Sequence, residues 1–88
     1  MDYQKEFKKA LLSRPHSILG KRGVSNEFIK HIMKLLKRYR VIKIKALKTV
    51  ATKSNIKEIA QEIASATNST VLDVRGKIII LSLKAIKN

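Results

Sequence analysis

The sequence has no cysteine and no tryptophan, only one proline, and two Tyr and two Phe as its large aromatic side chains. Without cysteine, a disulfide scaffold and a cysteine-ligated zinc site are both excluded, and the composition suits a reducing cytoplasm. The longest apolar run, at residues 78–81, is far shorter than the ~20 residues that a membrane span needs. The N-terminal residues also lack the apolar stretch of a signal peptide. We therefore expect a soluble, cytoplasmic protein with no membrane partner.

Acidic side chains are also few, because 6 Asp and Glu stand against 20 Lys and Arg, for a net charge of +14 in 88 residues. Self-repulsion of this size disfavours a compact state, so a polyanionic partner is expected, and nucleic acid is the natural one. Residues 1–48 carry 14 basic and 3 acidic side chains, whereas residues 49–88 carry 6 and 3. The positive field therefore belongs to the first half of the chain. A lysine-rich surface kept for solubility is the alternative.

Groups that could support catalysis are scarce as well. The two histidines, His16 and His31, fall in different expected elements, and the six carboxylates are scattered. No spacing matches a metal site, and the string GKRG lacks the longer glycine spacing and the Lys-Ser/Thr ending of a P-loop. We therefore predict that the protein is not an enzyme and has no catalytic residue, metal or cofactor.

Hydrophobic periodicity predicts seven elements in the order αβαβαββ. The segments are helices at 2–13, 26–38 and 53–67, and strands at 16–19, 41–47, 70–75 and 77–83. Pro15 should end the first helix and mark the first strand as an edge, residues 49–52 should form a connection, and Gly76 should lie in a tight antiparallel turn. We expect residues 1–88 to form a single domain of the α+β class, with a small mixed four-stranded sheet packed with helices.

Two of the strands indicate how the sheet is buried. In residues 41–47, Ile42 and Ile44 alternate with Lys43 and Lys45, which predicts a strand with one face in solvent. Residues 77–83 are apolar on both faces, which predicts an interior strand. The helix at 53–67 is nearly neutral, so we expect it to lie away from a bound anion.

The string GKRG, at residues 20–23, lies between the first strand and the second helix. A GxxG turn at this place can point its N–H groups outward, and the start of the next helix adds further unpaired N–H groups and partial positive charge. Gly20 and Gly23 would let a phosphate approach, while Lys21 and Arg22 would supply charge. Ser25 is the expected N-cap of the helix. The alternative is a plain turn with two solvated cations.

A row of cations follows on the second helix, where Lys30, Lys34 and Lys37 recur on one face beside Arg38. Neighbouring like charges oppose the helix unless something negative lies along them, although a solvated face would show the same pattern. Because aromatic side chains are few, base stacking is disfavoured. Recognition should therefore act on the backbone and shape of a nucleic acid.

Four strings of this chain occur in the order seen in one known family. They are RP followed by ILGKRGVS (14–15 and 18–25), VIKIK (41–45), IAQEI with Thr67 (59–63), and VRGKIIIL (74–81). These strings resemble the basic-Pro and G-K-x-G-[LV]-[TS] signature, the L-I-K-V-K strand, the third helix and the V-x-G-[KR]-x-[IVL]-[IVL]-L ending of the CRM domain (chloroplast RNA splicing and ribosome maturation). The chain is similar to the stand-alone, YhbY-like form of that domain over about residues 7–84.

The resemblance implies a fold similar to the C-terminal domain of bacterial translation initiation factor three. It also implies RNA binding through the GxxG loop and the adjoining basic surface, on precursor large ribosomal subunits in bacteria or group II introns in plant organelles. We expect a monomer that binds ribosomal RNA, as a maturation factor or a ribosome-bound protein. The predicted RNA-binding residues are Arg14, Gly20, Lys21, Arg22, Gly23, Ser25, Lys30, Lys34, Lys37, Arg38, Lys43 and Lys45.

The chain departs from the family at Leu11, where members often have histidine, at His16, which replaces an apolar residue, and at residues 82–84. None of these lies in the loop, and the lysine- and isoleucine-rich composition is typical of an archaeal member. Three alternatives stay open. One is an Alba-like architectural protein that binds DNA as a homodimer, although Gly23 replaces the proline of its I-G-K-[KR]-P string. The others are a KH domain, in which Asn26 would be apolar, and an adaptor that binds no nucleic acid.

Overall fold

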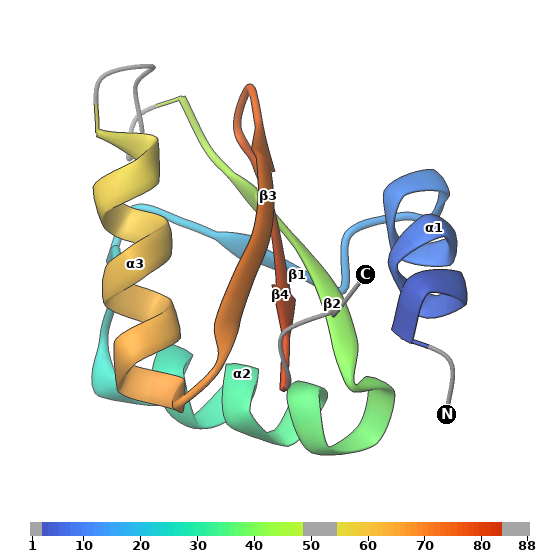
Figure 1. Cartoon of the computed structure of the whole chain (residues 1–88). Helices are drawn as coiled ribbons and strands as arrows, with labels where there is room; N and C mark the ends of the chain where they lie inside the picture. The colour runs from blue at the N-terminus through green and yellow to red at the C-terminus, as the bar shows by residue number, and fades with distance from the viewer. Residues whose placement is uncertain (1–2, 49–54, 84–88) are drawn as a thin grey trace.

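The computed structural model describes residues 3–48 and 55–83, and within them three helices and four strands follow each other in the predicted order (Figure 1). Their bounds are α1 (Tyr3–Leu12), β1 (Ser17–Leu19), α2 (Asn26–Tyr39), β2 (Val41–Ala46), α3 (Ile56–Thr67), β3 (Thr70–Arg75) and β4 (Ile78–Ser82). The α+β class is confirmed, and the ends differ from the predicted ones by a few residues. Asp2, the connection at 49–52 and the expected helix start at Lys53 lie outside the described residues. No described helix is long and apolar enough to cross a membrane.

The sheet is mixed, as predicted, and its strand order is β1-β2-β4-β3. β1 runs parallel to β2, whereas β4 is antiparallel to both β2 and β3. β4, which is apolar on both faces, is therefore an interior strand, as predicted. β1, which follows Pro15, is an edge strand, also as predicted. β3 and β4 are joined by a two-residue turn in which Gly76 has a φ of +57°, a value that suits glycine because it has no Cβ.

Helices α2 and α3 lie on one face of the sheet and close the larger hydrophobic core (Figure 1). Each aliphatic side chain that is fully buried in such a core contributes about 1.5–3 kcal/mol to the stability of the fold. The buried aliphatic residues that the strands and the two helices bring together include Leu19, Ile32, Leu36, Ile42, Ile44, Ala60, Ile63, Ile79 and Leu81.

Helix α1 covers the opposite face of the sheet, where Ala10, Val41 and Ile80 form a smaller core. The prediction that this face of β2 lies in solvent is therefore wrong for the first half of the strand, where Val41 is buried and Lys43 is half-buried. The physical reason is that α1 has an apolar stripe of its own, and α2 and α3 already cover the other face. Helix α1 reaches only part of the way across, so Lys45 remains exposed.

Lys43, on β2, is hydrogen-bonded both to the end of α1 and to His16, the residue before β1. Nζ of Lys43 donates hydrogen bonds to the carbonyls of Leu11 (3.0 Å) and Ser13 (2.9 Å), at the end of a helix where carbonyls lack partners within the helix. The N–H of Lys43 donates to Nδ1 of His16 (2.9 Å), and the N–H of His16 donates to the carbonyl of Lys43 (2.7 Å). Burial and the charge of Lys43 lower the pKa of His16, so the imidazole is held in the neutral form that can accept this bond.

Candidate nucleic-acid interface

The string GKRG forms a tight turn at the carboxyl end of β1. The N–H of Gly23 donates to the carbonyl of Gly20 (2.9 Å), and the N–H of Ser25 donates to the carbonyl of Gly23 (3.1 Å). Lys21 and Arg22 occupy the two central positions of the turn, and both are exposed. The turn therefore presents two cations to solvent at the point where the chain passes from the sheet to α2.

The two glycines of the turn differ in what the fold asks of them. Gly23 has a φ of +66°, a left-handed value that costs a residue with a Cβ roughly 1–2 kcal/mol. Gly20 has no positive φ, and a Cβ built on it would meet no atom within 4 Å. The turn itself thus explains Gly23, whereas the fold does not require glycine at position 20. The bare backbone there leaves room for a ligand to approach closely.

Helix α2 begins directly behind the turn, and Ser25 is its N-cap, as predicted. Oγ of Ser25 accepts the N–H of Phe28 (3.1 Å), while the remaining N–H groups of the first turn give this end a partial positive charge. Nη1 of Arg22 lies 3.8 Å from Oε2 of Glu27, and both side chains are 88% exposed. An ion pair this exposed contributes at most about 1 kcal/mol, so Arg22 can exchange Glu27 for a phosphate at little cost.

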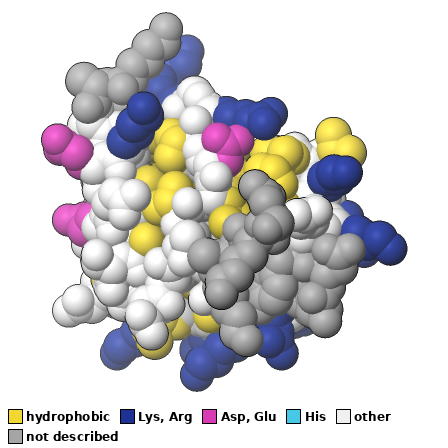
Figure 2. Space-filling model, viewed as in Figure 1, with side chains coloured by type: hydrophobic (Ala, Val, Ile, Leu, Met, Phe, Trp, Pro, Cys, Tyr) yellow, Lys and Arg dark blue, Asp and Glu magenta, His cyan; other side chains and the backbone are white. Residues whose placement is uncertain are grey.

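The outer side of α2 carries the exposed cations Lys30, Lys34, Lys37 and Arg38, which we call the α2 ridge. In Figure 2, Lys and Arg side chains gather along the lower edge of the molecule, where α2 lies, and the acidic side chains at the left lie over α3. No member of the α2 ridge forms an ion pair with another described residue. Their mutual repulsion is therefore not relieved within the described part of the chain.

The far end of the α2 ridge packs against the start of β1. The guanidinium of Arg38 lies 5.3 Å from the centre of the Tyr39 ring, and the centres of the Tyr39 and His16 rings are 4.8 Å apart. Arg14 is exposed and is two positions before His16 in the chain, so its backbone lies near the end of the ridge that is away from the GKRG turn. Tyr39 already contacts two side chains, which leaves less of its ring for a nucleobase.

Two of the predicted RNA-binding residues lie on a different surface. Lys43 and Lys45 project from the face of the sheet that α1 covers, whereas α2 lies on the other face. The ammonium group of Lys43 is bonded to carbonyls at the end of α1, and Lys45 is exposed beside Ile18 of β1. The structure thus brings together the GKRG turn, Ser25 and the α2 ridge, with the backbone of Arg14 near one end, and places Lys43 and Lys45 on the opposite face of the sheet from the α2 ridge.

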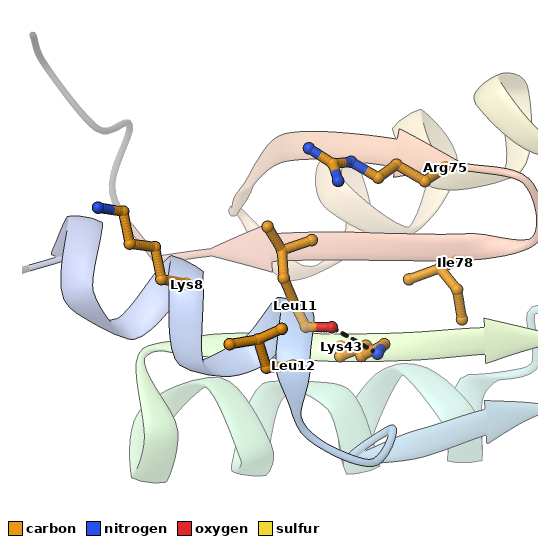
Figure 3. Close-up of a pocket in the computed structure, with 6 residues that line it drawn as sticks. All are labelled: Lys8, Leu11, Leu12, Lys43, Arg75 and Ile78. Carbon is orange, nitrogen blue, oxygen red and sulfur yellow. Dashed lines mark hydrogen bonds between the residues drawn. The ribbon is translucent and has the colours of Figure 1, made fainter.

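A groove on the α1 face of the sheet, which we call the sheet groove, was not predicted from the sequence. It has a volume of about 380 Å³ and is lined by Lys8, Leu11, Leu12, Lys43, Arg75 and Ile78 (Figure 3). Leu12 is 90% exposed, because it lies outside the apolar stripe of α1. A leucine off the helical stripe is the sequence signal that could have pointed to this groove.

The chemistry that these surfaces offer is that of cations and N–H donors. Across residues 3–48 and 55–83, no three His, Asp or Glu side chains lie close enough together to hold a metal ion. Lys and Arg side chains with the N–H groups of a helix start are the groups that proteins use to hold phosphates. The arrangement can therefore bind an anionic chain through charge and hydrogen bonds.

Comparisons with known proteins agree with this picture. The sequence matches the family model of the CRS1/YhbY (CRM) domain over residues 4–81. Among solved structures, the chain is similar to the solution structure of the hypothetical protein SAV1595 from Staphylococcus aureus, described as a candidate RNA-binding protein. The TM-score is 0.74 and the sequence identity 25%, and the match covers 99% of this chain and 88% of that one. No curated protein matches significantly. Because the family model spans nearly the whole sequence, the chain belongs to the CRS1/YhbY (CRM) domain family.

Proposed function

We propose that this protein binds RNA, and that it holds the RNA strand along the GKRG turn and the α2 ridge. The observation that carries the proposal is continuity. The surface runs without a break from Lys21 and Arg22, at the GKRG turn, over the start of α2 to the exposed lysines of the α2 ridge. No member of the α2 ridge forms an ion pair with another described residue. Membership in the CRM family supports RNA as the partner, and the similar Staphylococcus aureus protein is described as an RNA-binding candidate.

In this proposal a phosphate lies against the backbone of Gly20, where no side chain blocks the approach. Lys21 and Arg22 contact the same or the next phosphate, and Arg22 leaves Glu27 to do so. The strand then follows Lys30, Lys34 and Lys37 toward Arg38 and Arg14. Such contacts fix the position of the RNA but carry little sequence information, so binding should depend on backbone and shape.

The family resemblance suggests the target. We propose ribosomal RNA of the large subunit or its precursor, bound in the cytoplasm by a monomer in which residues 1–88 form one domain. The protein would act in ribosome maturation or as a ribosome-associated protein, without enzymatic activity and without a cofactor.

The proposal is tested by the salt dependence of RNA binding. The double variant Lys21→Ala/Arg22→Ala should bind structured RNA more weakly regardless of its sequence. The slope of log affinity against log salt should become shallower by roughly 1.5, because each lost phosphate contact removes ~0.7–0.9. Gly20→Val should also weaken binding while leaving the melting temperature unchanged, since the fold leaves space for its side chain. Fluorescence anisotropy over a salt series measures both effects.

A matched control removes the same charge elsewhere. Lys5→Ala/Lys57→Ala changes two exposed cations on α1 and α3, and its salt slope should stay close to that of the unmodified protein. Equal slopes for the two double variants would remove the phosphate from the GKRG turn. A preference for duplex DNA over structured RNA, together with a homodimer in solution, would instead favour the Alba-like alternative.

A further inference from the structure

The sheet groove is an apolar surface that the proposed RNA path along α2 does not use. Leu11, Leu12 and Ile78 form its apolar lining, and Lys8, Lys43 and Arg75 border it. In Figure 3 the side chain of Leu11 points from α1 toward Arg75, and Ile78 closes the end nearer the β3–β4 turn. An exposed apolar surface bordered by charged groups marks a place where a partner binds.

The charges around the sheet groove specify an anionic occupant. Lys8 is exposed and forms no ion pair with any other described residue. Asp73 lies on the same face of β3, but its carboxylate accepts hydrogen bonds from Nε of Arg75 and from the N–H of Val74. The hydrogen bond from Nε of Arg75 to Asp73 fixes the plane of the guanidinium and does not use its two outer nitrogens. A guanidinium plane of this kind can stack on a nucleobase.

The groove lies close to the GKRG turn. Ile18 pairs with Lys45, and Lys45 pairs with Ile78, so these three residues form a row across one face of three adjacent strands. Strands are ~4.8 Å apart, which places Ile78 roughly 10 Å from Ile18, and Ile18 is two residues before Gly20. Ile18 is 57% exposed. An exposed apolar residue and an exposed cation thus lie between the turn and the groove.

We propose that the sheet groove receives an unpaired nucleotide of the RNA strand that the GKRG turn holds. The base lies against Leu11, Leu12 and Ile78 with the Arg75 guanidinium on its face, and Lys45 and Lys8 contact the flanking phosphates. This inference rests on the proposed RNA-binding function. It adds a place where the protein contacts a base, so single-stranded RNA next to a structured element should bind more tightly than the structured element alone.

The test uses a variant that the fold tolerates. Leu12→Glu places a carboxylate at the edge of the groove on a side chain that is 90% exposed, and Ala66→Glu adds the same charge at an exposed position on α3. The probes are an RNA hairpin with a short single-stranded extension, the same hairpin with abasic sugars in the extension, and the hairpin alone. Melting temperatures of both variants check that they are folded.

We expect Leu12→Glu to lower the affinity for the extended hairpin about tenfold, which is the loss typical of one stacked base. Ala66→Glu should lower it much less. Abasic sugars should weaken binding to the unmodified protein by a similar factor and leave binding to Leu12→Glu unchanged, because that variant has already lost the base contact. RNA carrying 4-thiouridine in the extension should crosslink to the peptide that contains Leu12.

Two results would overturn the inference and leave the proposed function intact. One is equal binding of the intact and abasic extensions by the unmodified protein, while Lys21→Ala/Arg22→Ala still flattens the salt slope. The other is an amphipathic peptide of alternating Leu and Glu that binds the unmodified protein but not Leu12→Glu, with RNA affinity unchanged by that variant. The second result would assign the groove to a protein partner. If neither the turn nor the groove variants affect RNA binding, the proposed function itself fails.

Discussion

The two faces of the sheet are covered to different extents. On one face, α2 and α3 bury a continuous core that includes Ile42, Ile44 and Ile79. On the other, α1 covers a smaller hydrophobic cluster of described residues, Ala10, Val41 and Ile80, and leaves the sheet groove open beside it. Because buried apolar area supplies most of the stability of a small domain, the α2/α3 face should determine whether the protein folds. The α1 face can then carry exposed groups such as Ile18 and Leu12 at little cost.

The largest expected effect is on the α2/α3 face. Ile79→Asp should unfold the protein, because it places an unpaired carboxylate in the core at a cost of more than about 4 kcal/mol, close to the whole stability of a domain this small. Ile18→Asp, on the partly exposed α1 face, should cost about 1 kcal/mol or less. Urea denaturation followed by circular dichroism measures both. A cooperative transition for Ile79→Asp near that of the unmodified protein would show that this face is not the main core.

A smaller effect is expected where α1 joins the sheet. Lys43→Met keeps the aliphatic stem but removes the ammonium group that bonds the carbonyls of Leu11 and Ser13. We expect a loss of about 1–2 kcal/mol, concentrated in α1. Amide hydrogen exchange should therefore become faster in α1 while the α2/α3 face keeps its protection. Lys45→Met, one position further along the same face, is the control and should leave exchange in α1 unchanged.

The smallest effect concerns His16, whose pKa is lowered by burial and by Lys43. In the unfolded chain this group titrates near 6.5, so between that pH and its lower folded pKa the unfolded state binds more protons. Stability contributed by neutral His16 is therefore complete above about pH 6.5 and falls as the solution is acidified toward the folded pKa.

His16→Gln keeps a side-chain oxygen that can accept the N–H of Lys43, but it does not titrate. Its melting temperature should therefore fall less than that of the unmodified protein between neutral pH and about pH 5. Carboxylates titrate in both proteins, so only the difference between the two curves is informative. Identical curves would mean that protonation of His16 does not affect the fold.

The elements and their order could be predicted because each has a clear period. The helical stripe and the Ser25 cap located α2, the apolar run at 78–81 located the interior strand, and Gly76 located the turn between β3 and β4. The face that α1 covers could not be predicted in this way. Periodicity shows that a helix has an apolar side, but it does not show which face of a sheet that side will contact.

The candidate site could be predicted only where its residues follow one another in the chain. The GKRG turn, Ser25 and the α2 ridge are consecutive, so their position on one surface follows from a turn leading into a helix. Lys43 and Lys45 lie on the opposite face of the sheet from the α2 ridge, and their surroundings depend on how α1 packs. The sheet groove joins α1, β2, β3 and β4, which come together only in the folded chain. The RNA-binding role of each of these residues stays a prediction.

The two edge strands of the sheet, β3 and β1, are poor templates for pairing with another molecule. Between Val71 and Asp73 the pairing with β4 shifts register, which bulges this outer strand, and the adjacent Asp73–Arg75 pair places charges along it. The strand at the opposite edge of the sheet, β1, is only three residues long. Bulges, charges and short edge strands all hinder the addition of a strand from a neighbouring molecule. Both edges of the sheet therefore resist edge-to-edge association, which limits aggregation of concentrated protein.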